Sequence, residues 1–127
     1  MSTPAVVYVV DDDEAVRDSL CLLIEIHGFE ARSFERPDAF ARAFKRPEAG
    51  CVILDQHFPG TSGIDFLLSP PGRAIDLPVI LLTGRGDDAI RARARSAGVF
   101  AYFDKPVADN LLLGSIERAV ELSAGQA

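Results

Sequence analysis

Carboxylates cluster behind two apolar runs of this sequence. Asp11, Asp12 and Asp13 directly follow the first apolar run, and Asp55 directly follows another. Carboxylates within a few ångströms of one another repel, and each raises the pKa of its neighbours, so such a cluster calls for a cation. A hard cation such as Mg²⁺ binds well to a few carboxylates while it keeps several waters. The sequence therefore predicts a divalent metal site for Mg²⁺ or Mn²⁺ if the fold brings these residues together.

A hydroxyl and an ammonium stand in equivalent positions elsewhere in the chain. Thr83 ends one apolar run, and Lys105 lies just beyond another. A bound metal makes a crevice attractive to a phosphoryl group, a lysine adds positive charge, and a hydroxyl can donate to a phosphoryl oxygen. Phosphoryl transfer needs mainly positioning and charge neutralisation, and a carboxylate is a known nucleophile that yields an acyl phosphate. This set of residues is therefore suited to phosphoryl transfer.

Each of these residues has an ordinary explanation when it is taken alone. Consecutive aspartates suit a solvated turn at a helix N-terminus, and a lone threonine or lysine is usually a strand-end or surface residue. Their joint occurrence behind four apolar runs favours a site. Asp55 stands alone after its run, so we assign it as the nucleophile, and the adjacent Asp11 and Asp12 as the metal-binding pair. Asp13 is expected to face solvent or to cap the following helix.

The segments between these residues predict how the fold positions them. Strands are expected at 5–10, 29–34, 51–54, 78–82 and 99–103. Helices are expected at 14–27, 37–46, 63–68, 88–97 and 108–123, with a break at Pro70 and Pro71 and a frayed tail at 124–127. Strict alternation predicts an α/β fold with a five-stranded parallel sheet and helices on both faces. Ligands bind at the carboxyl ends of such strands, where all the candidate residues fall.

Composition and charge exclude several classes of protein. The net charge of −6 argues against a large basic face for nucleic acid and against an anionic membrane surface. No apolar stretch is long enough for a transmembrane helix, and residues 1–10 lack the features of a signal peptide, so a cytoplasmic location is expected. Cys21 and Cys51 are predicted to be small buried apolar residues and not disulfide or zinc partners.

Four motifs in order carry a family resemblance. They are VVDDDE at 9–14, VILDQHFPGTSG at 52–63, PVILLTG at 78–84 and FAYFDKP at 100–106. With these motifs the chain resembles a receiver domain of two-component response regulators, most closely the nitrogen-fixation regulator type. The resemblance implies a flavodoxin-like (βα)5 doubly wound sheet of order 2-1-3-4-5. It also implies one receiver domain over residues 1–127, with a core at about 5–123.

The resemblance also implies a role for each site residue. Asp55 would be phosphorylated by a histidine kinase or a phosphotransfer protein. Asp11, Asp12, Asp55 and the main-chain carbonyl of His57 would bind the metal. The phosphoryl group would contact Thr83 and Lys105, Tyr102 would be a switch residue, and the peptide bond between Lys105 and Pro106 would be cis.

The implied function is a signalling switch and not an enzyme. Phosphorylation would change the surface formed by 88–97, 99–103 and 108–123, through which a homodimer or an output partner would bind. Nucleic acid would be reached only through an effector domain outside this chain. The weakly apolar helix 88–97 is expected to be among the less stable elements. Its arginines, with Arg85 before it, form either a solvated face or a partner-binding face.

Two other functions remain open from sequence. A metal-dependent phosphatase resembling haloacid dehalogenases would also use Asp55 as nucleophile, but it would need a second aspartate where His57 stands. A receiver-like module that binds partners without phosphorylation would usually have lost an acidic or lysine position. His57 is expected to face solvent, and Gly84 is expected to leave the phosphoryl site open.

Overall fold

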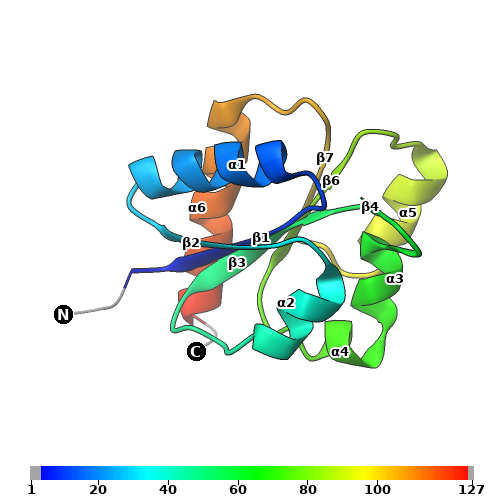
Figure 1. The fold of residues 1–127 in the computed structure, drawn as a ribbon, viewed down its shortest axis with the longest axis horizontal. Helices are drawn as coiled ribbons and strands as arrows, with labels where there is room; N and C mark the ends of the chain where they lie inside the picture. The colour runs from blue at the N-terminus through cyan, green and yellow to red at the C-terminus, as the bar shows by residue number, and fades with distance from the viewer. Residues whose placement is uncertain (1–3, 126–127) are drawn as a thin grey trace.

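A five-stranded parallel sheet forms the centre of the molecule. The computed structural model describes residues 4–125. The sheet strands are β1 (Val6–Val10), β2 (Glu30–Phe34), β3 (Gly50–Asp55), β6 (Val79–Thr83) and β7 (Ala101–Asp104). They lie in the order β2-β1-β3-β6-β7 (Figure 1). Since β6 and β7 are the fourth and fifth strands of this sheet, the predicted order 2-1-3-4-5 is confirmed. Because β3 pairs with β1 on one side and β6 on the other, Asp55 ends the central strand.

Helices cover both faces of this sheet. They are α1 (Glu14–Ile26), α2 (Pro37–Ala43), α3 (Gly63–Leu68), α4 (Pro70–Arg73), α5 (Asp88–Ser96) and α6 (Asp109–Gly125). Apolar residues of α1 and α6 pack on one face of the sheet, and those of α2, α3 and α5 pack on the other. Figure 1 shows α1 above the strands, α2 and α4 below them, and α6 passing behind them. Within the described part of the chain, no helix is long and apolar enough to cross a membrane.

Three of the four strands that lead to the site residues are fully buried, whereas the fourth, β7, is a partly exposed edge strand. Every residue of β1, β3 and β6 is buried, as continuous apolar runs predict for strands covered on two faces. On one face, an aromatic cluster joins Tyr8 to Phe34, Phe40 and Phe44, with ring centroids 5.2–6.5 Å from Tyr8. Close packing on both faces fixes the ends of these strands, and therefore fixes the residues that follow them.

The helix predicted at 37–46 is shorter in the structure. α2 ends at Ala43, because Phe44 adopts an extended conformation with ψ of 129°. This turn lets the Phe44 ring pack 5.6 Å from the ring of Tyr8. The Lys45 carbonyl then accepts a hydrogen bond of 3.1 Å from the Tyr8 hydroxyl. Aromatic packing therefore outweighs the helical pattern of residues 44–46.

Two proline-containing segments form structure that the sequence pattern did not predict. Pro70 and Pro71 do not simply end a helix, because they open the short helix α4, where a missing N–H has no cost. The Ser69 hydroxyl accepts a bond of 3.3 Å from the Gly72 N–H at its N-terminus. Before α3, β4 (His57–Phe58) pairs with β5 (Thr61–Ser62) in a small antiparallel hairpin. Gly60 has the positive φ of 82° that this tight turn needs.

Helix caps follow the sequence prediction more closely. The Asp13 carboxylate caps α1 by accepting hydrogen bonds from the Ala15 and Val16 N–H groups, at 2.9 and 3.3 Å. Asp87 caps α5 in the same way. Cys21 is half-buried and Cys51 is buried, and both are free thiols. Burial raises the pKa of the Cys51 thiol to about 12, so it stays protonated.

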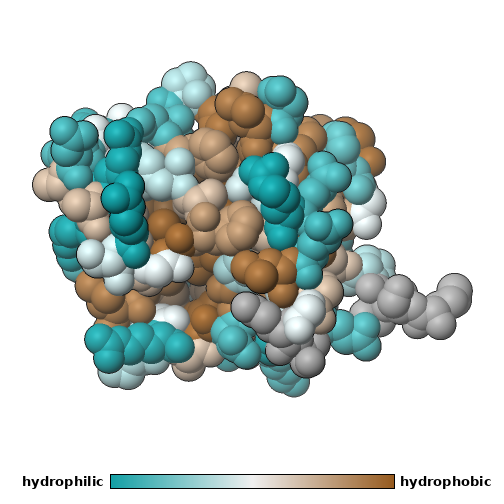
Figure 2. All heavy atoms as spheres, turned by 180° about the vertical axis from the view of Figure 1, so that it is seen from behind, coloured by the Kyte–Doolittle hydropathy of each residue, from teal (hydrophilic) through white to brown (hydrophobic). Residues whose placement is uncertain are grey.

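The far side of the molecule carries a mixed surface. Figure 2, which views the molecule from behind, shows hydrophobic residues gathered in the middle of this face and hydrophilic residues around them. α5 contributes arginines to the exposed surface, and β7 is an edge strand whose residues from Ala101 to Phe103 are partly exposed. An edge strand with exposed apolar and charged neighbours is a common binding surface.

Candidate functional site

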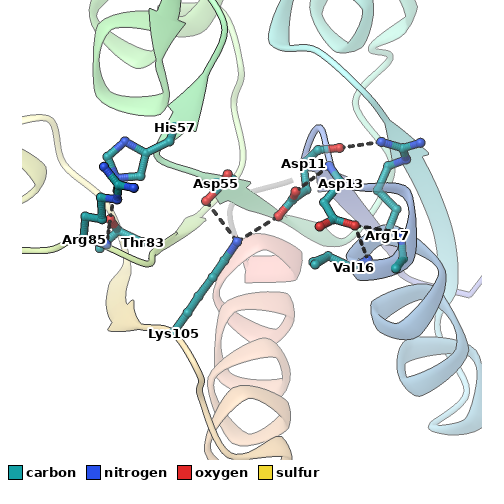
Figure 3. Close-up of polar contacts among 10 residues, drawn as sticks. Asp11, Asp13, Val16, Arg17, Asp55, His57, Thr83, Arg85 and Lys105 are labelled. Carbon is teal, nitrogen blue, oxygen red and sulfur yellow. Dashed lines mark hydrogen bonds and ion pairs between the residues drawn. The ribbon is translucent and has the colours of Figure 1, made fainter.

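The predicted site residues meet at the carboxyl edge of the sheet. The Lys105 ammonium lies 3.1 Å from a carboxylate oxygen of Asp11 and 3.1 Å from one of Asp55. Figure 3 shows the lysine side chain reaching between these two carboxylates. Asp11 follows β1, Asp55 ends β3, and Lys105 follows β7. Three distant segments thus converge on one point, as the rule for parallel strand ends predicts.

A group of carboxylates at this point fits a divalent cation. Asp11, Asp12 and Asp55 each offer an oxygen, and these oxygens lie within 4.8 Å of one another. Asp11 and Asp55 are buried, whereas Asp12 is exposed. This all-oxygen set, open to solvent on one side, matches the ligands and retained waters that Mg²⁺ prefers. The Asp13 carboxylate lies outside this group and caps α1.

The loop that carries Asp11 and Asp12 is held by its own hydrogen bonds. One oxygen of Asp11 accepts a bond of 2.9 Å from the Asp13 N–H. The Arg17 guanidinium donates a bond of 2.8 Å to the main-chain carbonyl of Asp11 (Figure 3). Sequence reasoning missed Arg17, because its role depends on the direction of a long side chain on the first turns of α1. Its contact holds the main chain at Asp11.

The electrostatics of the site leave negative charge uncompensated. Burial raises the pKa of the Asp55 carboxyl above its ordinary value, and the charge of Asp11 raises it further, while Lys105 partly offsets both. Burial by itself would lower the pKa of Lys105, but its hydrogen bond to Asp11 and the charges of Asp11 and Asp55 raise it. The lysine is therefore charged at neutral pH, and one ammonium does not neutralise the carboxylates around it.

The predicted hydroxyl residue, Thr83, lies at the end of β6, on the strand next to that of Asp55. Its side chain is completely buried. Its hydroxyl oxygen accepts a hydrogen bond of 3.2 Å from the Arg85 N–H and lies 3.1 Å from Nε2 of His57. The His57 side chain is exposed, as predicted, but its ring is not simply in solvent because it contacts Thr83 (Figure 3). This contact was missed from sequence.

Comparison with known proteins identifies the family. Residues 7–117 match the family described as the response regulator receiver domain. The chain belongs to this receiver family. It is 35% identical over 120 residues to the transcriptional regulatory protein FixJ of Bradyrhizobium diazoefficiens, covering 94% of this chain and 58% of FixJ. It is 34% identical over 122 residues to the response regulator protein TmoT of Ectopseudomonas mendocina, covering 96% of this chain and 56% of TmoT.

A solved structure agrees with this assignment. The response regulator StyR superposes on this receiver domain with a TM-score of 0.87 and 32% identity, covering 98% of this chain and 63% of that one. The chain spans little more than half the length of the FixJ and TmoT proteins it matches. The resemblance seen in the sequence motifs is therefore confirmed, including its likeness to the FixJ type. Receiver domains of response regulators are signalling modules that accept phosphoryl groups from histidine kinases.

Tyr102 of this receiver domain lies on β7 and faces the segment after Thr83. Its hydroxyl donates a hydrogen bond of 3.2 Å to the Asp104 carboxylate. The Arg91 guanidinium lies 5.4 Å from the centroid of its ring. A Cβ placed on Gly86 would collide with the Tyr102 hydroxyl and lie 2.9 Å from the Thr83 methyl group. Tyr102 and Thr83 therefore pack against the same glycine. The next peptide bond beyond this region, between Lys105 and Pro106, is cis.

Proposed function

We propose that this receiver domain is a phosphorylation-activated switch in which Asp55 accepts a phosphoryl group from a histidine kinase or a phosphotransfer protein. The observation that carries the proposal is the position of Lys105, whose ammonium lies 3.1 Å from both Asp11 and Asp55. A nucleophilic carboxylate beside a fixed cation and further acidic groups is the arrangement that phosphoryl transfer needs.

The transfer step follows from these side chains. An oxygen of the Asp55 carboxylate attacks phosphorus, the bond from phosphorus to the donor nitrogen breaks, and an acyl phosphate forms on Asp55. Lys105 neutralises part of the charge on the transferred group. Thr83, buried at the end of the neighbouring strand, donates its hydroxyl hydrogen to a phosphoryl oxygen.

Asp11, Asp12 and Asp55, together with the main-chain carbonyl of His57, would hold Mg²⁺ or Mn²⁺. The support for this ligand set is the spacing of the three carboxylates, within 4.8 Å of one another. A divalent cation supplies charge neutralisation at the phosphoryl oxygens. Lys105 then remains available to contact the same group from the other side.

The output surface is the face formed by α5, β7 and α6. When Thr83 moves toward the phosphoryl group, the space beside Gly86 changes and Tyr102 turns inward. Contacts of Tyr102 with Asp104 and Arg91 link this movement to α5. The change biases a two-state equilibrium. A homodimer or an output partner binds the altered face, and nucleic acid is reached only through an effector domain.

In this proposal residues 1–127 form one receiver domain that works in the cytoplasm and is not an enzyme. A phosphatase of the haloacid dehalogenase kind would need a second carboxylate where His57 stands, and the ring of His57 is instead bonded to Thr83. Turnover of a phosphomonoester substrate would contradict the assignment. Binding to a partner without phosphorylation is the remaining alternative, and Asp55→Asn would leave such binding unchanged.

The direct test is phosphorylation by a small acyl-phosphate donor. The protein is incubated with the donor and Mg²⁺, and its intact mass is measured. We expect the gain of one phosphoryl group in the wild type and none in Asp55→Asn or without Mg²⁺. Asp65→Asn is a matched control, because Asp65 is an exposed aspartate paired with Arg93, and it should be phosphorylated normally. Equal labelling of Asp55→Asn would defeat the proposal.

A further inference from the structure

The imidazole of His57 lies against the hydroxyl of Thr83. Nε2 of the ring is 3.1 Å from the threonine oxygen, and the two residues are joined by a dashed line in Figure 3. The threonine side chain is completely buried, whereas His57 is exposed. The histidine therefore stands on the solvent side of Thr83, beside the proposed acceptor Asp55.

The hydrogen in this bond comes from the threonine. The Thr83 oxygen already accepts a hydrogen bond of 3.2 Å from the Arg85 N–H, and a hydroxyl carries one hydrogen of its own. Thr83 has no exposed surface from which water could accept that hydrogen. Within residues 4–125, Nε2 of His57 is the acceptor in reach of it. Because buried hydroxyls satisfy their donors, we infer that Thr83 donates its hydrogen to Nε2 of His57, which accepts it.

The position of the histidine is set by rigid local structure. His57 belongs to β4, where it is opposite Ser62 of β5. The neighbouring Gln56 accepts hydrogen bonds from the Gly63 N–H through its main chain, at 2.9 Å, and from the Ile64 N–H through its side chain, at 3.0 Å. The hairpin and the start of α3 thus fix the backbone from which the ring reaches Thr83.

This bond competes with the proposed signalling contact. The single hydrogen of Thr83 cannot be donated to His57 and to a phosphoryl oxygen together. We propose that His57 is a positioning residue that holds the Thr83 hydroxyl in the unphosphorylated state, so that phosphorylation must exchange one hydrogen bond for another. The proposal rests on the proposed function of Asp55 and extends it. In this inference, the His57 side chain shifts the equilibrium of the receiver domain toward its unphosphorylated arrangement.

Removal of the acceptor should therefore favour the phosphorylated arrangement. His57→Phe keeps a ring of similar size without an acceptor nitrogen, and His57→Gln keeps an acceptor oxygen near the place of Nε2. His27→Phe is the matched control, because it changes the other of the two histidines, which lies at the end of α1. The probe is beryllium fluoride with Mg²⁺, a stable substitute for the phosphoryl group. Binding is followed by the NMR signals of the Thr83 methyl group and the Tyr102 ring.

The expected changes are specific in direction and size. His57→Phe should reach half-saturation at a beryllium fluoride concentration about two- to tenfold lower than wild type, the effect of one net hydrogen bond. His57→Gln and His27→Phe should stay close to wild type. In a Thr83→Val background, which lacks the hydroxyl, His57→Phe should have no effect. A merely structural role of the ring would persist in that background.

A second measurement tests the bond directly. The ¹⁵N signals of the His57 ring in the unmodified protein should report an unprotonated Nε2. A protonated Nε2 would overturn the proposal, as would equal half-saturation of wild type and His57→Phe, or an equal shift in the Thr83→Val background. If wild type binds beryllium fluoride through Asp55 but substitution of His57 has no effect, this inference is wrong and the proposed function still stands. Wild type that does not bind, or that binds no better than Asp55→Asn, overturns the proposed function and this inference together.

Discussion

Lys105 places one ammonium 3.1 Å from each of two buried carboxylates, so a single side chain carries much of the charge balance of the site. The lysine itself is partly exposed, with 29% of its side chain accessible, whereas Asp11 and Asp55 are 4% and 8% accessible. Removal of a cation from such a group leaves buried negative charge without a partner. The same removal also frees both carboxylates to bind another cation.

Lys105→Met should therefore lower stability and strengthen metal binding. Without divalent cations, we expect the free energy of unfolding to fall by about 1–3 kcal/mol. The dissociation constant for Mg²⁺ should fall at least about threefold, because the metal no longer competes with an ammonium. Urea unfolding and calorimetric titration measure the two effects. Lys45→Met changes the other lysine, at an exposed position away from the carboxylates, and should change neither quantity. Unaltered Mg²⁺ affinity in Lys105→Met would contradict the prediction.

Asp55 should give the metal-free protein a characteristic pH dependence. Burial and the charge of Asp11 raise the pKa of its carboxyl in the folded protein. The neutral form is therefore favoured by folding, so its contribution to stability is complete below the unfolded pKa of about 3.9 and is lost as pH rises through the folded pKa. Asp55→Asn does not titrate. Its free energy of unfolding relative to wild type should rise as pH increases from about 4 to 7.

Urea unfolding of both proteins in chelated buffer at several pH values measures this difference. A comparison of the two proteins cancels the contributions of exposed carboxyls such as Asp38 and Asp65, whose pKa values are lowered by arginines and hydrogen bonds. A difference that stays constant with pH would show that Asp55 ionises in the folded protein as it does in the unfolded chain.

Residue types and positions predicted which residues form this site but not which hydrogen bonds they make. Asp11, Asp55, Thr83 and Lys105 could be found because each follows an apolar run, and strand ends meet at one edge of a parallel sheet. The bond from Thr83 to His57 depends on the direction of a ring on a two-residue strand. No periodicity or spacing in the sequence encodes such a direction, so the imidazole was expected only to face solvent.

At the scale of elements, the N-terminus of α1 separates capping from metal binding. The three consecutive aspartates 11–13 have different roles. Asp13 caps the helix, whereas Asp11 and Asp12 belong to the cluster of carboxylates with Asp55. Asp13→Ala should cost about 1 kcal/mol of stability, because two main-chain N–H groups lose their acceptor. Its dissociation constant for Mg²⁺ should stay within about twofold of wild type, since the metal ligands remain. Asp12→Ala is the converse control, with weakened Mg²⁺ binding and an intact cap. Thermal unfolding and Mg²⁺ titration distinguish the two variants.

α5 is only weakly packed against the sheet. Ala94 is its one buried residue, and its arginines reach Asp65 and Asp104 through exposed ion pairs of 2.9 and 3.5 Å. Exposed ion pairs stabilise little, so this helix should open without the rest of the fold. Amide hydrogen exchange should give α5 opening free energies roughly 2 kcal/mol or more below those of β1 and β3. Equal protection of α5 and these strands would contradict the expected local opening.

The elements that sequence reasoning placed wrongly are those decided by packing or turn chemistry. α2 stops early because Phe44 joins the aromatic cluster on Tyr8, a long-range contact invisible to a local pattern. The predicted end of α3 before Pro70 is confirmed, but the short helix α4 was missed, although Ser69 is a good cap and proline suits the first turn of a helix. The hairpin around Gly60 had a usable signal, since a proline followed by glycine commonly marks a tight turn.

For the molecule as a whole, alternation of apolar runs with amphipathic stretches was sufficient to predict the architecture. The sheet order and the two helical layers are as expected. Right-handed crossovers and the burial of both faces of a parallel sheet leave few other arrangements for such a pattern. Side-chain detail is not constrained in this way, because many packings satisfy the same pattern of buried and exposed positions.

The central place of β3 bears on how long a phosphorylation signal would last. Asp55 is the final residue of β3, which is paired with a neighbouring strand on each side. Local opening of α5 therefore leaves Asp55 in place. The lifetime of the acyl phosphate on Asp55 would then depend on the access of a hydrolytic water and not on local opening of α5. A mild dose of urea that accelerates amide exchange in α5 should leave the half-life of the acyl phosphate unaltered. In such a molecule, a substitution could change the mobility of the face formed by α5, β7 and α6 without changing the half-life of the phosphorylated state.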